Sequence, residues 1–211
     1  MKETEAKPAL RISHIVYGRQ LVKNRVYYLV DPKVGGDLRA VPETVVLQRW
    51  RRRRFPAHTF SGARLSSTLW RAVGLALGNN AKALCNMSTQ SLSAAIDEQR
   101  TLLREHHYAL PAPVALHALF DVCGPDRLAA ILNRHLAPDR GNLSGIPDLF
   151  LYAIRTETGL PSIARFVEVK KPEERVSQAQ IDEIDFLNGL GLHARVLRLI
   201  EPKSRSLVDS E

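Results

Sequence analysis

The chain has 211 residues, of which 45% are hydrophobic and 25% are charged, so it can bury a core as one domain or as one domain with an appendage. No apolar run approaches the length of a membrane helix, and the Met-Lys-Glu-Thr-Glu start lacks the apolar core of a signal peptide. We therefore expect a soluble, cytoplasmic chain. Secretion into a target cell by a route without a cleaved signal remains open. The formal net charge of +8 favours a polyanionic partner such as nucleic acid.

The two cysteines do not form a disulfide scaffold. Cys85 lies in a polar, turn-like stretch and Cys123 lies near the end of an apolar helical segment. We expect both thiols to be reduced and buried, in a reducing compartment, because no further ligands are suitably spaced to complete a zinc site.

The N-terminal part reads as strands followed by a basic helix. Residues 10–17 and 24–30 have strand composition, and turn-forming residues 31–37 follow them. The densest charge in the chain comes next, in the run Arg-Trp-Arg-Arg-Arg-Arg-Phe at residues 49–55. Its arginines could grip a phosphate backbone while Trp50 or Phe55 stacks on a base, or they could form a solvated helix end or a patch for an acidic protein. The candidate DNA contacts in this run are Arg49, Arg51, Arg52, Arg53 and Arg54.

A helical region follows the basic run. Helices are predicted over residues 64–79 and 88–107, and over a pair, 111–123 and 126–136, that is broken at the Gly-Pro of residues 124–125. The linker after this pair carries Arg140, which either touches a phosphate backbone or is simply part of a loop. We expect two units: an N-terminal appendage of strands and a basic helix, residues 1–87, and the main domain, residues 88–211.

Residues 145–180 hold the most informative pattern. The apolar run 149–154 and the β-branched run 164–170, separated by turn formers, predict two paired strands. Alternate side chains of a strand share a face, so Glu168 and Lys170 point the same way about 7 Å apart, while Val167 and Val169 point into the core. Asp148 opens the partner strand and can come beside Glu168.

Two carboxylates and one lysine therefore converge on one spot. Asp148 and Glu168 can bind a hard divalent cation such as Mg²⁺, and Lys170 can orient or activate an attacking water or steady the charge of a phosphate. The competing interpretation is a turn aspartate beside a solvated cross-strand ion pair. A glutamine early in the following helix favours the cation site.

These motifs resemble the VRR-Nuc branch of the PD-(D/E)xK nuclease superfamily. The resemblance is carried by Gly-Ile-Pro-Asp-Leu at residues 145–149, by Val-Glu-Val-Lys-Lys-Pro at residues 167–172, by Ser177 with Gln180, and by Gly191 ahead of Val196 and Arg198 in a last strand predicted over residues 193–200. Residues 125–139 are similar to the segment before the motif in Fanconi-associated nucleases. The resemblance covers roughly residues 113–200.

The resemblance implies an α/β fold with a mixed central sheet flanked by helices, and hydrolysis of DNA phosphodiester bonds with Mg²⁺ or Mn²⁺. It assigns the cation to Asp148, Glu168 and the Val169 carbonyl, the positioning of the nucleophile to Lys170, and the support of the site to Gln180. Lys171, next to the site, is a further candidate DNA contact.

Such nucleases often add a carboxylate from an upstream helix. In the Fanconi-associated branch this glutamate precedes Gly-Gly, and no Glu-Gly-Gly occurs in this chain. Glu98 is the candidate to test first, against the alternative that it lies on a solvated helix face.

The biological role has three interpretations. The resemblance suggests a toxin of the type VI secretion kind, with an acidic immunity protein as partner, or a repair nuclease for branched or flapped DNA; the shortness of the chain favours the toxin. The third interpretation is an inactive nucleic-acid-binding module whose working surface is residues 49–54.

Overall fold

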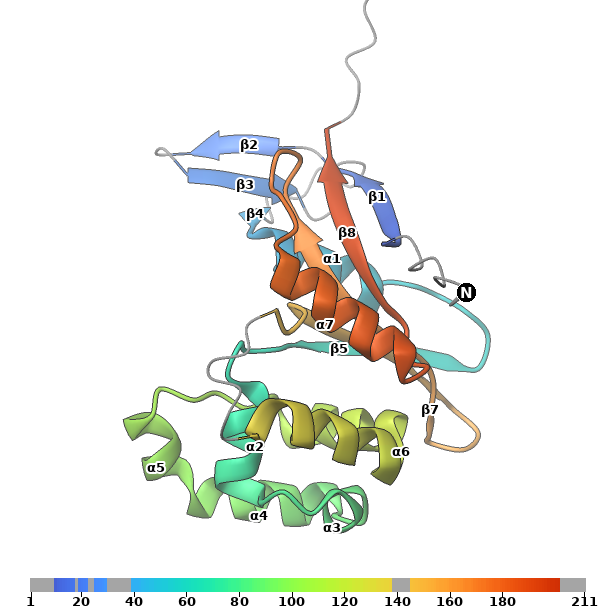
Figure 1. Ribbon diagram of the computed structural model, residues 1–211. Coiled ribbons are helices and arrows are strands. Elements are labelled where there is room, and N and C mark those ends of the chain that lie inside the picture. Colours follow the sequence, from blue (N-terminus) through green and yellow to red (C-terminus); the bar gives the residue numbers. More distant parts are fainter. Residues whose placement is uncertain (1–9, 18, 23–24, 30–38, 138–144, 202–211) are drawn as a thin grey trace, which may run out of the picture.

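The computed structural model describes residues 10–17, 19–22, 25–29, 39–137 and 145–201 (Figure 1). Its centre is a five-stranded sheet in the order β1-β8-β7-β6-β5. The strands are β1 (Ile12–Val16), β5 (His58–Arg64), β6 (Leu149–Arg155), β7 (Pro161–Lys170) and β8 (Ala194–Ile200). β1 and β7 run parallel to β8, whereas β6 runs antiparallel to both β5 and β7. The predicted mixed sheet of an α/β fold is confirmed.

A second, small sheet joins β2 (Arg19–Val22), β3 (Arg25–Leu29) and β4 (Arg39–Ala40). It lies near α1 (Pro42–Arg51), which follows β4 directly. Pro42 at the start of α1 suits a first helical turn, where a backbone N–H has no helical partner to lose.

The central sheet is covered on both faces, which explains the nearly continuous apolar run of β6. On one face, Phe150, Tyr152 and Phe166 belong to one apolar cluster with residues of the helices that follow β5 in the chain. On the other face, Leu151, Val167 and further apolar strand residues pack against α1. The two clusters follow from strand alternation, because neighbouring residues of one strand point to opposite faces.

The remaining helices form a layer beside the first face (Figure 1). They are α2 (Leu69–Leu77), α3 (Ala81–Cys85), α4 (Thr89–Glu98), α5 (Arg100–Glu105), α6 (Pro113–Leu136) and α7 (Gln178–Gly189). The predicted helix over residues 88–107 is divided at Gln99 into α4 and α5, and Ser88 caps α4 by accepting a bond from the Ser91 N–H. The predicted break at Gly124 lies inside α6, where this glycine leaves the helical conformation with a φ of 65°.

Strands from both sides of residue 87 build the central sheet. β1 and β5 lie in the segment expected as an N-terminal appendage, and they form the two edges of the sheet that carries β6, β7 and β8. Gly62 explains how β5 fits: a Cβ there would lie 2.8 Å from the Phe150 carbonyl oxygen and 2.9 Å from a methyl group of Leu47. Within the described ranges, no helix combines the length and the apolar character needed to cross a membrane.

Candidate active site

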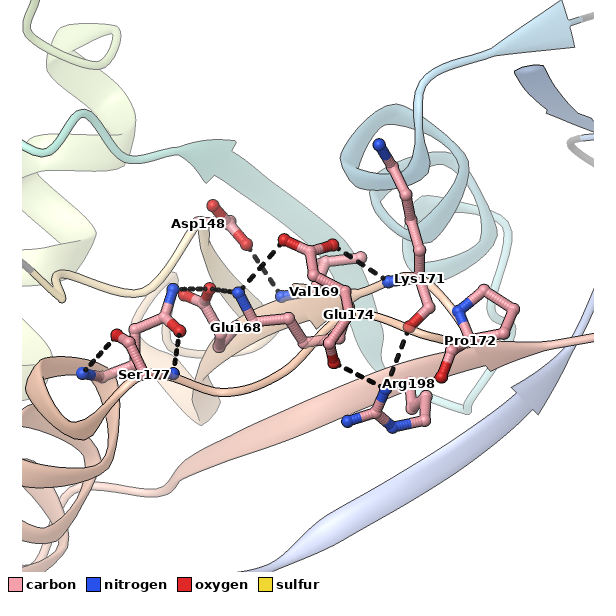
Figure 2. A network of polar contacts seen from close by, with 10 residues as sticks. Asp148, Glu168, Val169, Lys171, Pro172, Glu174, Ser177 and Arg198 are labelled. Atoms are coloured by element: carbon pink, nitrogen blue, oxygen red, sulfur yellow. Dashed lines mark hydrogen bonds and ion pairs between the residues drawn. The ribbon is translucent and has the colours of Figure 1, made fainter.

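The carboxylates of Asp148 and Glu168 lie together at one end of the adjoining strands β6 and β7 (Figure 2). Asp148 immediately precedes β6, and its Oδ2 accepts a hydrogen bond of 2.8 Å from the Val169 N–H. Glu168 follows Val167 in β7, and Val167 belongs to the apolar cluster under α1. Alternation therefore turns Glu168 toward the opposite face, the side on which α7 packs.

Gln180 contacts Glu168 from the start of α7. Its Nε2 donates to Glu168 Oε1, and its Oε1 accepts from the Ser177 N–H at 2.9 Å. The Ser177 hydroxyl in turn accepts from the Gln180 N–H, which completes a capping box. The same glutamine thus begins the helix and holds the Glu168 carboxylate in place.

Lys170 lies between two glutamates. Its Nζ is 3.0 Å from Glu168 Oε1 and 3.3 Å from Glu174 Oε1. Burial alone would lower the pKa of Lys170, but the contacts with Glu168 and Glu174 outweigh it, so the pKa is raised and the ammonium is retained.

Arg198 of β8 fixes the turn that carries Glu174. Its Nη1 donates to three carbonyl oxygens, those of Lys171 at 3.0 Å, Pro172 at 2.7 Å and Glu174 at 2.8 Å. The three carbonyl oxygens share the two N–H groups of this charged nitrogen, and a charged donor strengthens the hydrogen bonds that it makes. The turn after β7 is therefore held beside the carboxylates (Figure 2).

The environment of the two carboxylates disfavours negative charge. Burial raises the pKa of Glu168 to about 7, and the neighbouring charge of Asp148 contributes in the same direction. Burial also raises the pKa of Asp148; the bond from Val169 opposes this, and the nearby charge of Glu43 adds to it. A cation between the two groups would reverse both effects.

The donor set fits a hard divalent cation. Glu168 Oε2 is buried and has no hydrogen-bond partner in the described part of the chain, which is costly for a carboxylate oxygen. Asp148 Oδ2 is engaged by Val169, whereas no hydrogen bond to its Oδ1 is found in the described ranges. Two carboxylate oxygens suit Mg²⁺, which is bound by few carboxylates and keeps several waters. No three His, Cys, Asp or Glu side chains of the described residues are grouped to hold an ion by themselves.

Glu98 does not join this site. It is an exposed residue at the end of α4, a helix that packs against α2, α5 and α6, apart from the end of β7 where the carboxylates lie. The acid that sequence reasoning missed is Glu43, in the first turn of α1, close enough for its charge to affect Asp148. Glu43 lies 3.7 Å from the Arg64 guanidinium. Its sequence signal is a Pro-Glu helix start ahead of the arginine run.

The arginine run does not form one uniform surface. Arg51 Nη2 donates to the Gly62 carbonyl at 2.9 Å, and Arg54 donates to two neighbouring carbonyls. Arg53 lies over the Trp50 ring, with its Cζ 4.7 Å from the ring centroid. Trp50 is buried and donates from Nε1 to the Tyr152 carbonyl, so it is not placed to stack on a base, whereas Phe55 is 59% exposed.

The other predicted residues are placed as follows. Lys171 is exposed beside the site, and Arg49 and Arg52 are exposed on and just after α1. Arg140 lies outside the described residues. Both cysteines are free thiols; Cys123 is buried, as predicted, whereas Cys85 is only half-buried, contrary to the prediction. Burial raises the pKa of Cys123 to about 12, so this thiol is not reactive.

Comparison with known proteins links this arrangement to a family and to a fold. Residues 89–199, more than half of the chain, match the VRR-NUC domain. Two crystal structures of paFAN1, one bound to 5′-flap DNA with a 2-nucleotide flap and a gap and one to its 1-nucleotide counterpart, are similar with TM-scores of 0.53 and 16% sequence identity. The first similarity covers 99% of this chain and 40% of paFAN1, and the second covers 93% and 39%. Among curated proteins, none matches.

Proposed function

The chain belongs to the VRR-NUC domain family, and from this premise we propose that it is a metal-dependent DNA nuclease that hydrolyses phosphodiester bonds. The observation that carries the proposal is the buried Glu168 Oε2 beside Asp148, which has no partner among the described residues, with Lys170 bonded to the other oxygen of the same carboxylate. A purely structural ion pair would leave no carboxylate oxygen buried without a partner.

Each residue has a role in this proposal. A bound Mg²⁺ or Mn²⁺ supplies Lewis-acid stabilisation of the phosphate charge and lowers the pKa of a coordinated water. Asp148 and Glu168 hold the cation, with the Val169 carbonyl as a further ligand. Lys170 orients the attacking water, and Gln180 keeps Glu168 from rotating. Glu43 is the proposed outer carboxylate in place of Glu98.

Exposed basic residues serve as proposed contacts to the DNA backbone. These are Lys171, next to the carboxylates, and Arg52 and Arg54 beyond the end of α1. The helix α1 spans 10 residues, about 15 Å, from Glu43 near the site to the arginines. At about 3.4 Å per nucleotide, about four nucleotides of a duplex strand cover this length. Such contacts read the backbone, so we expect specificity for DNA shape or none.

The biological role is also a proposal. The chain spans about 40% of the length of paFAN1, whose crystal structures hold 5′-flap DNA, and this favours a nuclease for flapped DNA in repair. A toxin of the type VI secretion kind, masked by an acidic immunity protein, is the alternative. Bacterial growth distinguishes them: arrest on expression that is lost with Asp148→Ala supports the toxin, and normal growth with cleavage limited to flaps supports repair.

Cleavage of plasmid and 5′-flap DNA in Mg²⁺, Mn²⁺ or EDTA tests the activity. We expect cleavage that EDTA stops and that Glu168→Ala and Lys170→Ala each reduce by at least about two orders of magnitude, the scale of losing a metal or transition-state contact. Lys82→Ala, an exposed lysine of α3, is the matched control and should cleave normally. DNA binding without metal-dependent cleavage would instead support an inactive binding module.

A further inference from the structure

A second candidate site lies on the face of the sheet opposite the carboxylates. It is a cavity of about 230 Å³ between α1 and the strands β1, β8, β7 and β6, lined by four arginines, Tyr17, Ser13 and an apolar floor. The arginines are Arg49, Arg53, Arg165 and Arg195. Its floor is formed by residues of the apolar cluster under α1, whereas Glu168 points toward α7.

Strand register explains why the arginines converge. Arg165 pairs with Leu151 of β6, and Arg195 pairs with Val167 of β7, so both side chains belong to the face that packs on α1. The guanidinium carbons of Arg53 and Arg165 lie 4.7 Å and 5.7 Å from the centroid of the Trp50 ring. Arg49 is similarly placed over Tyr17, at 5.5 Å.

No negative charge of the described residues compensates this cluster. None of the residues that line the cavity is acidic, and none of the four arginines has an ion pair within the described ranges. Burial lowers the pKa of Arg165 and of Arg195, and the repulsion from neighbouring arginines adds to it. Arg165 and Arg195 are partly buried, whereas Arg49 and Arg53 are exposed. The partly buried, unpaired charges of Arg165 and Arg195 are unfavourable unless an anion joins them.

Among the described residues, two buried polar atoms of this cavity also have no hydrogen-bond partner. The Tyr17 side chain is 1% exposed, and its hydroxyl has no hydrogen-bond partner among the residues that the structure describes. The same holds for the Nε of Arg195. Both are hydrogen-bond donors, and both belong to residues that line the cavity.

We propose that this cavity binds a phosphate monoester, the terminal phosphate of a nucleotide or of a nucleic-acid strand. A guanidinium group can bind phosphate through two parallel N–H···O hydrogen bonds. A dianionic phosphate also neutralises the charge of four neighbouring arginines better than a single carboxylate does. The size of the cavity admits a phosphate with part of its nucleoside but no duplex. The apolar floor under Trp50 accommodates the uncharged part of such a ligand.

Calorimetric titration of the full chain with adenosine 5′-monophosphate tests the proposal. The buffer contains EDTA, and Asp148→Asn is titrated in parallel, so that binding is measured apart from the hydrolytic site. We expect Asp148→Asn to bind as the wild type does, and Arg165→Gln combined with Arg195→Gln to bind at least tenfold more weakly. Adenosine, which lacks the phosphate, should not bind measurably.

The matched control is Arg104→Gln with Arg155→Gln, which removes the same charge from exposed positions and should bind normally. The variant with both Arg165→Gln and Arg195→Gln, the cavity double variant, should melt at or above the melting temperature of the wild type, because two mutually repelling cations are removed. A loss of binding therefore does not report unfolding.

A trinucleotide with and without a 5′-phosphate distinguishes the two sources of the ligand. Tighter binding of the phosphorylated trinucleotide, weakened tenfold in the cavity double variant, identifies a strand end; the same behaviour of the mononucleotide alone identifies a free nucleotide. The proposal is overturned if no phosphate compound distinguishes the double variant from the wild type, or if only an acidic peptide such as polyglutamate does.

Discussion

Replacing Glu168 by glutamine is expected to stabilise the metal-free protein above neutral pH. Burial, and then the charge of Asp148, raises the pKa of Glu168 from the ordinary 4.5 to about 7. The folded protein thus holds this proton more tightly than the unfolded chain does. Its stabilising effect is complete below pH 4.5 and is lost as the pH rises through 7.

The displacement of this pKa corresponds to about 3 kcal/mol of unfolding free energy. Glu168 is 2% exposed, so solvent screens the effect little. Glutamine keeps the shape but cannot ionise. In EDTA at pH 8, Glu168→Gln should therefore unfold at a higher urea concentration than the wild type, and its free energy of unfolding should be higher by up to about 3 kcal/mol. This difference in free energy should shrink toward zero near pH 5.

Glu98→Gln is the control, because Glu98 is an exposed acid of α4; it should leave stability unchanged at both pH values. Adding Mn²⁺ at pH 8 should stabilise the wild type and not Glu168→Gln, since only the carboxylate binds the cation. The reasoning would be refuted if Glu168→Gln were less stable than the wild type at pH 8, or if its stability differed from that of the wild type by the same amount at pH 5 and pH 8.

Three further substitutions test how the site is held. Glu183 of α7 is buried between Arg134 and His135 of α6, so Glu183→Ala should lower the free energy of unfolding in urea by about 3–5 kcal/mol. Replacing its exposed neighbour, Asp182→Ala, should lower it by less than about 1 kcal/mol. Gly145→Ala would place a Cβ 2.4 Å from the Ala179 carbonyl oxygen, so it should displace the start of α7 with Gln180 and reduce DNA cleavage; Gly159→Ala, with a similarly positive φ but open space around it, should not. Arg198→Ala should free the turn after β7, seen as faster amide exchange at Lys171 and Glu174, with Arg155→Ala unchanged.

The sequence was most informative where motif and periodicity agreed. Strand alternation placed Val167 and Val169 in the core and Glu168 with Lys170 on the other face, and the structure has this arrangement. Fold class and family resemblance are confirmed by the mixed sheet and by the VRR-NUC match. The reason is physical: β6 and β7 pair locally through one loop, so their register follows from short-range signals.

Long-range partners could not be predicted. The residues of β5 read His-Thr-Phe-Ser-Gly-Ala-Arg, a run with little apolar alternation, and this strand forms only by pairing with β6, far along the chain. The contact of Glu43 with the site depends on the packing of α1 against the sheet. In the sequence, Arg165 and Arg195 are typical of exposed strand residues. Only the register of the strands shows that both line one cavity.

Glu183 shows the same limit in the helical layer. Glu183 lies 49 residues after Arg134 and 48 residues after His135 in the chain, and its contacts with them join α7 to α6. No periodic pattern of apolar residues in the sequence predicts this contact. The two bonds outweigh burial, so the pKa of Glu183 is lowered and the contact stabilises the protein until the pH falls below that pKa.

Anomalous diffraction from crystals soaked in Mn²⁺ tests the central claim most directly. We predict one peak within about 2.5 Å of Asp148 Oδ1 and Glu168 Oε2, absent from crystals of Glu168→Ala treated in the same way. No peak there, in crystals whose protein cleaves DNA in Mn²⁺, would contradict the assignment of these two carboxylates as the metal site.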